Sequence, residues 1–239
     1  MARRPPHVLI TGASQGIGAV IATLFARETR ACLSLVARQG VKLRLVARAC
    51  RAAGAEAAEA FRCDVSDARA VREMARAVRA RHGDVDVLIN NAGSFLPEPL
   101  TKMSVEGFDA MLGANLRSAF LVTREFASVM AKRRRGDIFF MASVASVRVF
   151  PRGGAYSAAK HGLLGLARAF RAELKPRGVR VITILPGATR SPSWEGSGVP
   201  AARMMQTEDV ARAFLDAYRM SRRTVVEEII LRPQLGDVE

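Results

Sequence analysis

The sequence predicts an α/β fold in which helices cover both faces of a seven-stranded parallel sheet. Short apolar runs alternate with stretches of i, i+3, i+4 apolar spacing, and strands that are apolar throughout are typical of a sheet buried on both faces. The length of 239 residues and the hydrophobic content of 49% suit a globular domain of this kind. The expected strands, in chain order, are His7–Thr11, Cys32–Val36, Ala57–Cys63, Val85–Asn90, Asp137–Ala142, Val179–Leu185 and Val225–Leu231.

The stretches between these runs predict the covering helices. Two long helices are expected at Ser104–Met130 and Ala155–Leu174. Thr207, which precedes two acidic residues, is expected to cap the last helix at its N-terminus. Because no repeat, linker or low-complexity tract interrupts the alternation, residues 1–239 are expected to form a single domain.

Several function classes are excluded at this level. A membrane-spanning helix needs about 18 consecutive apolar residues, and the sequence contains no such run. The charged start is followed by too short an apolar run for a secretory signal, so a cytoplasmic protein is expected. The three cysteines lack CxxC spacing and the three histidines lack metal-ligand spacing, which argues for reduced thiols and against a metal site.

A glycine-rich turn follows the first expected strand directly. Gly12, Gly16 and Gly18 are spaced Gly-x3-Gly-x-Gly between that strand and a helix. Without side chains, such a turn folds tightly and lets the backbone approach a pyrophosphate at the positive end of the helix. The turn therefore predicts a dinucleotide site.

The end of the second expected strand indicates which dinucleotide binds. An acidic residue there accepts a hydrogen bond from the ribose 2′-hydroxyl, whereas an arginine accommodates a 2′-phosphate. The strand ends in Ala37-Arg38 with no Asp or Glu at its tip, so NADP(H) is expected in preference to NAD(H), which stays open as the alternative. Because 32 of the 37 basic residues are arginine, an arginine at position 38 could occur by chance. The missing carboxylate is therefore stronger evidence for NADP(H) than Arg38 itself.

A tyrosine, a lysine and a serine form the candidate catalytic set. Tyr156 and Lys160 are four residues apart, which puts them on one face of a helix, although the same spacing also occurs on ordinary helix surfaces. A free phenol has a pKa of about 10, and a nearby cation lowers it toward the range that acid–base catalysis needs. Ser143 follows the fifth expected strand, at the sheet edge where open α/β sheets bind ligands.

Taken together, these residues resemble the short-chain dehydrogenase/reductase family over nearly the whole chain. Six motifs in the family's order make the resemblance specific, and it implies a Rossmann-like, doubly wound sheet and an oxidoreductase that uses NAD(P). The motifs are Thr11-Gly12-x3-Gly16-Ile17-Gly18, Cys63-Asp64-Val65, Asn90-Asn91-Ala92-Gly93, Asn115 with Ser143, Tyr156-x3-Lys160 and Pro186-Gly187.

The resemblance also implies roles for individual residues. Tyr156 would exchange the proton with the substrate oxygen, and Lys160 would lower its pKa and hold the nicotinamide ribose. Ser143 would hydrogen-bond the carbonyl, and Asn115 would support a water-linked proton relay through Lys160. The implied cofactor contacts are Gly12, Ser14, Gln15, Gly16, Ile17, Gly18, Ala37, Arg38, Asp64, Val65, Asn91, Ala92, Gly93, Tyr156, Lys160, Pro186, Gly187, Thr189 and Ser191.

The expected reaction is NADPH-dependent reduction of a ketone or 3-oxo compound to an alcohol. NAD-linked alcohol oxidation is one alternative, and a non-catalytic dinucleotide-binding regulator that binds nucleic acid through a basic surface is another. Gln15 departs from the basic residue that many NADP-dependent members carry before the second glycine.

Residues 188–206 are expected to form a substrate loop or lid because they are rich in Gly and Pro. The substrate stays open among 3-oxoacyl groups, 3-hydroxy acids and other carbonyl compounds, and the chain end lacks the Gly-Gly tail of many 3-oxoacyl reductases.

The net charge of +15 would suit a nucleic-acid partner or an acidic one. The arginines are spread along the chain, however, and no helix-turn-helix, aromatic RNA motif or basic helix is present. A solvated basic surface is the preferred interpretation, with attraction to an acidic carrier protein as a further hypothesis. The resemblance implies a homodimer or homotetramer built on the two long helices.

Overall fold

Seven parallel strands form one continuous sheet at the centre of the protein. In the computed structural model, which describes residues 4–238, the strand order is β3-β2-β1-β4-β5-β6-β7. All six neighbouring pairs are parallel. The strands are β1 His7–Thr11, β2 Cys32–Ala37, β3 Ala57–Arg62, β4 Val87–Asn90, β5 Gly136–Met141, β6 Val179–Pro186 and β7 Glu228–Leu231.

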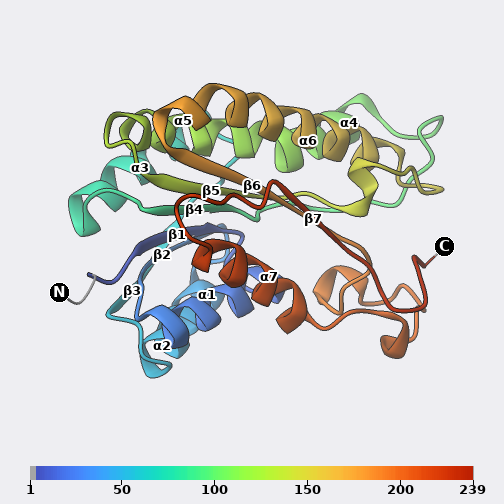
Figure 1. Ribbon diagram of the computed structural model, residues 1–239. Coiled ribbons are helices and arrows are strands. Elements are labelled where there is room, and N and C mark those ends of the chain that lie inside the picture. The colour runs from blue at the N-terminus through green and yellow to red at the C-terminus, as the bar shows by residue number, and fades with distance from the viewer. Residues whose placement is uncertain (1–3, 239) are drawn as a thin grey trace.

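Helices cover both faces of this sheet (Figure 1). One face carries α1 Gly16–Thr29, α2 Gly40–Ala52 and α7 Thr207–Arg219. The other carries α3 Ala68–His82, α5 Ser118–Lys132 and α6 Gly154–Leu174, with α4 Val105–Leu112 leading into α5. The short helical turns are η1 Gly113–Arg117, η2 Val144–Ser146, η3 Lys175–Arg177, η4 Pro192–Trp194 and η5 Ala201–Arg203.

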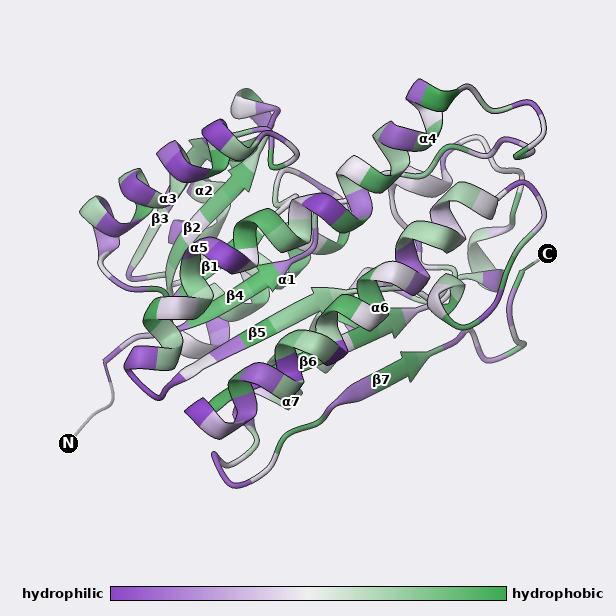
Figure 2. Ribbon diagram, turned by 90° about the horizontal axis from the view of Figure 1, so that it is seen from above, coloured by the Kyte–Doolittle hydropathy of each residue, from purple (hydrophilic) through white to green (hydrophobic). Residues whose placement is uncertain are grey.

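The strand sequences explain why the sheet is buried. Every residue of β6 is buried, as is every residue of β5. Because side chains alternate across a strand, Phe139 packs in the core on the α1 and α7 face, whereas its neighbour Phe140 packs under α5 and α6. In Figure 2, β6 and much of β5 are green, that is apolar, whereas α3 and α7 carry purple, hydrophilic stretches.

The predicted fold class is confirmed, and the strands match their expected positions within a few residues. Three details differ. The expected helix Ser104–Met130 is interrupted by the π-helical turn η1, since one extra residue is accommodated there. Gln206, not Thr207, is the N-cap of α7, and the Thr207 hydroxyl instead donates to Glu208 at 3.0 Å. The last strand begins at Glu228, three residues later than expected.

The three cysteines are free thiols, in agreement with the expectation of reduced cysteines. Within residues 4–238, no helix has both the length and the apolar composition needed to cross a lipid bilayer.

Candidate active site

One cleft at the carboxyl edge of the sheet collects the residues that the sequence analysis selected. Figure 2 shows the arrowheads of β5, β6 and β7 pointing toward this edge, on the side where the chain ends. The cleft has a volume of about 1610 Å³. Its lining includes every predicted catalytic and cofactor residue, from Gly12 in the first turn to Ser191 after β6. This placement brings the predicted set together, and the individual roles stay predictions.

The glycine turn after β1 is held from beneath by Asn91. The side-chain amide of Asn91 donates to the carbonyl oxygens of Thr11 at 2.9 Å and Gly12 at 3.2 Å. Gly12 has a φ of +66°, and a Cβ atom there would lie 2.8 Å from the Asn91 amide nitrogen. A side chain at Gly12 is therefore excluded by both the backbone conformation and the available space. Asn91 also lines the cleft, so its expected contact with the cofactor ribose stays a prediction beside this role in holding the turn.

Helix α1 begins at Gly16 with its first amides directed at the cleft. Among the described residues, no side chain caps this end, because the N-cap residue Gln15 makes no capping hydrogen bond. Uncapped amides at the positive end of a 14-residue helix suit an anionic ligand. The cradle beside them is narrow, since a Cβ at Gly18 would lie 2.5 Å from the Gly12 oxygen. The turn therefore fits a pyrophosphate bound against backbone.

The side of the cleft beyond β2 is basic. Arg38 is exposed directly after the strand and lies near Asp64, where its charge helps to lower the pKa of that carboxyl. The largest contribution to this lowering is the hydrogen bond from the Ser66 hydroxyl, at 2.7 Å. Lys42, in the first turn of α2, donates to the Gln15 side chain at 3.1 Å. This lysine brings a cation to the position where Gln15 itself offers none.

Tyr156 and Lys160 lie on the buried side of α6, as the four-residue spacing predicts. The Lys160 Nζ atom lies 5.5 Å from the Tyr156 ring centroid and donates to the Met141 oxygen at 2.8 Å. Burial lowers the pKa of Lys160 from 10.5 to about 7. Burial also raises the pKa of Tyr156, and its hydrogen bond with Ser143 only partly opposes this. The net shift of the Tyr156 pKa is therefore upward in the protein alone, opposite to the expected direction, because desolvation weighs most at both groups.

Ser143 lies just beyond the end of β5 and is 8% exposed. Its hydroxyl oxygen accepts from the amide of Ala145 at 3.1 Å, which fixes the side chain at the start of η2. The hydroxyl also lies 3.4 Å from the Pro186 carbonyl oxygen, to which it donates. Ser143 thus links the ends of two adjacent strands at the place where Tyr156 reaches the cleft.

Asn115 is buried within the π-helical turn η1. Its amide nitrogen donates to Ser94 at 2.8 Å and to Met111 at 3.0 Å, and its oxygen accepts from the Ser94 amide at 3.3 Å. A Cβ atom at Gly93 would lie 2.6 Å from the Asn115 oxygen and 3.7 Å from Lys160 Nζ. The missing side chain at Gly93 therefore lets Asn115 and Lys160 both lie close to this backbone position, which suits the expected relay.

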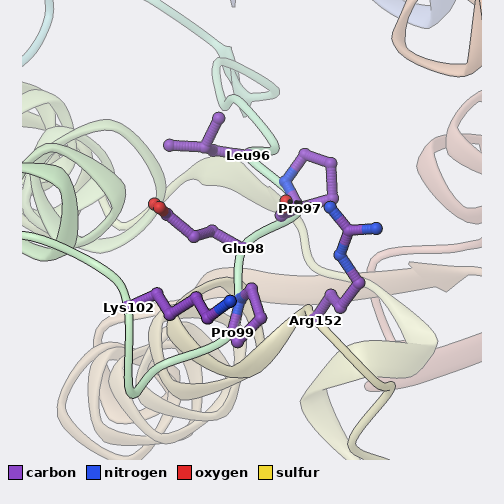
Figure 3. A pocket seen from close by; sticks show the side chains of 6 residues that line it. All are labelled: Leu96, Pro97, Glu98, Pro99, Lys102 and Arg152. Atoms are coloured by element: carbon purple, nitrogen blue, oxygen red, sulfur yellow. Dashed lines mark hydrogen bonds between the residues drawn. The ribbon is translucent and has the colours of Figure 1, made fainter.

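Aromatic side chains line the outer part of the cleft. Phe95 meets the Tyr156 ring edge to face at 5.2 Å between centroids, and Phe150 and Trp194 line the same space. A small side hollow of about 580 Å³ opens beside it (Figure 3). Arg152 closes that hollow by donating to the Pro97 oxygen at 3.3 Å, so the two loops that carry Phe95 and Phe150 are tied together.

Sequence reasoning missed Lys42, Phe95 and the chain end. Asp237 and Val238 both line the cleft, although they lie about 30 residues beyond the end of the expected lid. For Lys42 the sequence did offer a signal, namely a cation in the first turn of the helix that follows the second strand. For Asp237 the sequence offered none, because only the three-dimensional path of the tail after β7 returns it to the cleft.

Comparison with known proteins finds one family model, relatives and solved structures that this chain resembles. A family model described as short chain dehydrogenase matches residues 6–198. The sepiapterin reductase of Chlorobaculum tepidum is 36% identical, with 97% of this chain and 98% of that protein covered. An alcohol dehydrogenase from Thermococcus sibiricus, solved with 5-hydroxy-NADP, has a TM-score of 0.91 at 30% identity and covers 99% of this chain and 100% of its own. A metagenomic short-chain oxidoreductase solved with NADP has a TM-score of 0.85 at 35% identity, covering 97% of this chain and 99% of its own.

Proposed function

The chain belongs to the short-chain dehydrogenase family, and from this premise we propose that it reduces a carbonyl compound to an alcohol with NADPH. Members of the family are oxidoreductases that act on CH–OH and C=O groups with NAD(P). The single observation that carries the proposal is the convergence of Ser143, Tyr156 and Lys160 beside the glycine turn in one cleft. The regulator alternative has no use for such a proton donor.

The residues at the cleft fit a nicotinamide dinucleotide. The turn at Gly12 and Gly16 would hold its pyrophosphate, and the part of the cleft lined by Gly93 and Lys160 would take its nicotinamide half. When bound, the nicotinamide supplies the hydride and the protein supplies orientation and a proton. Arg38 and Lys42 favour a 2′-phosphate, and the two structural relatives with NADP ligands support the same choice.

Tyr156, Ser143 and Lys160 have different roles in the proposed proton transfer. The raised pKa of Tyr156 keeps its phenol protonated at neutral pH, which is the form that donates to a carbonyl oxygen during reduction. The Ser143 hydroxyl lies beside that phenol and would hydrogen-bond the same oxygen as negative charge develops. Lys160, with a pKa of about 7, exchanges protons readily at neutral pH and favours the phenolate that Tyr156 leaves behind.

The substrate is proposed to be a ring-bearing carbonyl compound. Phe95, Phe150 and Trp194 at the outer cleft provide apolar, flat surfaces that suit such a ligand. The similarity to a sepiapterin reductase over nearly the full length of both chains makes sepiapterin the first compound to test. Acyl thioesters of the 3-oxo type are the second, and faster reaction of carrier-protein thioesters at low salt would support the hypothesis of an acidic carrier.

The decisive test compares the wild type with Tyr156→Phe in NADPH oxidation against sepiapterin and a panel of ketones and 3-oxo thioesters. Loss of the proton donor is expected to lower kcat by about 10²- to 10⁴-fold, since general acid catalysis contributes that much. NADPH affinity, measured by fluorescence titration, is expected to change little. A Tyr156→Phe variant with wild-type kcat would refute the proposed function.

Cofactor choice is tested with Arg38→Ala. Loss of a charge-assisted contact to the 2′-phosphate is expected to weaken NADPH binding by about 10- to 100-fold, whereas NADH binding is unchanged. Arg48→Ala, at an exposed arginine of α2, is the matched control and is expected to affect neither cofactor. Equal weakening of NADPH and NADH by Arg38→Ala would contradict the phosphate role and favour NAD(H).

A further inference from the structure

A cysteine, a histidine and a glutamate meet at the edge of the sheet opposite to the cleft. Cys32 is the first residue of β2, His82 is the last residue of α3, and Glu59 lies in β3 beside β2. The Cys32 Sγ atom lies 3.1 Å from His82 Nδ1, and His82 Nε2 lies 4.0 Å from a carboxylate oxygen of Glu59. Thiol, imidazole and carboxylate thus stand in the order of a nucleophile, its base and a group behind the base.

The neighbours of His82 fix the direction of its contact with the thiol. A carboxylate accepts and cannot donate, so Nε2, the nitrogen that faces Glu59, carries the ring proton. Burial lowers the pKa of His82, so the ring is neutral at neutral pH and holds one proton only. Nδ1 is then an acceptor, and the Cys32 thiol donates to it. His82 is therefore in the form that can take the proton of the thiol.

The Nε2 atom of His82 is left unsatisfied in this resting arrangement. The side chain is only 8% exposed, and Nε2 has no hydrogen-bond partner among residues 4–238. At 4.0 Å, Glu59 is too far away for a hydrogen bond but close enough to attract a cationic ring. A buried donor without an acceptor costs free energy, and one explanation for such a group is redox or catalytic chemistry. Glu59 stabilises the charged ring that forms once His82 takes a proton.

Cys32 differs from the other two cysteines in its surroundings. It is half-buried, whereas Cys50 and Cys63 are buried. Burial raises the pKa of all three thiols, and the negative charge of Glu59 adds to this at Cys32. Free thiolate is therefore scarce at every cysteine. Access from solvent and a base that removes the proton during the reaction set Cys32 apart.

We propose that Cys32 is a peroxide-reactive thiol, with His82 as its base and Glu59 as the group that stabilises the charged base. The sulfur attacks one oxygen of hydrogen peroxide, so that an S–O bond forms as the O–O bond breaks. The thiol proton passes to His82 Nδ1 and then to the departing hydroxide, which leaves as water. Cysteine and peroxide give cysteine sulfenic acid and water, and the peroxide is the oxidant. This site is separate from the proposed carbonyl reduction, because Cys32 begins β2 whereas Arg38, at the cleft, follows its end.

The test measures sulfenic acid at each cysteine of the full chain. The protein is treated with hydrogen peroxide in the presence of dimedone, which traps sulfenic acid, and the labelled peptides are followed by mass spectrometry. Cys32 is expected to be labelled at least about tenfold faster than Cys50 or Cys63, because exposure and an adjacent base both favour the reaction. The two buried cysteines are internal controls.

Two variants test the parts of the cluster. His82→Asn removes the base and is expected to slow the labelling of Cys32 by about 10²-fold, the lower end of what a general base contributes. Glu59→Gln removes the charge behind the base and is expected to slow it about two- to fivefold, as for a partly exposed ion pair. Glu56→Gln, at an exposed carboxylate paired with Arg30, is the matched control and is expected not to slow the reaction. NADPH affinity, which depends on the opposite edge of the sheet, is measured for each variant to show that it is folded.

The sign of the Glu59→Gln effect separates this proposal from reaction of a free thiolate. If only the thiolate reacted, removal of a negative charge near Cys32 would speed the labelling, and that result would overturn the proposal. Equal labelling of the three cysteines, no labelling of Cys32, or an unchanged rate in a folded His82→Asn variant would overturn it as well. Carbonyl turnover is measured in a separate assay, so the failure of either proposal leaves the other standing.

Discussion

At the amino edge of the sheet, two buried aspartates have both carboxylate oxygens paired, whereas at the carboxyl edge a buried aspartate has one oxygen unpaired among the described residues. Asp137, at the start of β5, accepts from Arg180 at 2.6 Å and from Arg222 at 2.8 and 2.9 Å. Asp86, just before β4, accepts from Arg133 at 2.6 Å and from the His7 amide at 3.0 Å. Each of these carboxylates has both oxygens occupied.

The carboxyl edge contrasts with this. Lys160 is 3% exposed and donates to a single backbone oxygen, and Asp237 keeps one oxygen without a partner in the described part of the chain. Burying a charged group without full pairing costs stability, so an open group persists where a ligand completes it. The comparison teaches that the pairing of buried carboxylates, more than their burial, separates the functional edge from the structural one.

The largest expected effect comes from opening the paired edge. Asp137→Ala would leave Arg180, with a side chain only 7% exposed, as a buried charge that has lost its carboxylate. The free energy of unfolding is expected to fall by about 3–5 kcal/mol, measured by urea denaturation. Activity of the folded fraction is expected to stay near the wild-type value, because the cleft is at the opposite edge.

Asp216→Ala, at an exposed aspartate of α7, is the control for Asp137→Ala and is expected to change stability by less than about 0.5 kcal/mol. A loss of specific activity without a loss of stability in Asp137→Ala would break the division between the two edges.

The second prediction concerns His7, which is neutral at the paired edge. Its Nδ1 donates to the Asp84 carbonyl at 3.1 Å, since a carbonyl can only accept, and its Nε2 accepts from the Ser34 hydroxyl at 2.9 Å. Burial, together with the charge of the nearby His82, lowers the pKa of His7 from 6.5 to about 4. Because the pKa of His7 is lower in the folded protein than in the unfolded chain, the unfolded chain binds the proton more readily. His7 therefore imposes no cost above pH 6.5 and destabilises progressively as the pH falls toward 4.

The loss from His7 is expected to reach about 3 kcal/mol near pH 4. Urea denaturation of the wild type and His7→Gln between pH 7 and pH 4 measures it, and the variant is expected to show a shallower fall. His161→Gln, on the exposed side of α6, is expected to follow the wild-type profile. Identical profiles for the wild type and His7→Gln would show that His7 does not contribute to acid sensitivity.

The two edges also differ in how far the sequence predicted them. The strands and their parallel arrangement followed from apolar runs that alternate with helical patterns. The motif residues predicted the cleft because Gly12 and Ser143 follow strands and Tyr156 shares a helix face with Lys160. The pairing of Asp137 with Arg180 was not predicted, because it depends on the register between β5 and β6, which no local pattern reports. Asp237 was missed for the same reason. The direction of the Tyr156 pKa was predicted wrongly because spacing gives the distance to Lys160 but not the burial of both groups.

The smallest of the three expected losses of stability comes from adding a side chain at Gly93, and this change also acts on the cleft. A Cβ atom there would lie 2.6 Å from the Asn115 oxygen, so Gly93→Ala must displace that side chain from Ser94 and crowd Lys160. Overpacking of this kind is expected to lower the free energy of unfolding by about 1–3 kcal/mol. Displacement of Asn115, as a positioning side chain, is expected to lower kcat/KM by about 10- to 100-fold.

Gly165→Ala in α6 is the control, since no described atom lies within 4 Å of the new Cβ. It is expected to raise the free energy of unfolding by about 0.5–1 kcal/mol and to leave activity unchanged. Both variants need only a denaturation curve and an NADPH-oxidation assay. If Gly93→Ala lost stability but kept its wild-type kcat/KM, Asn115 would belong with the paired groups of the amino edge, and the boundary between the two edges would have to be redrawn around it.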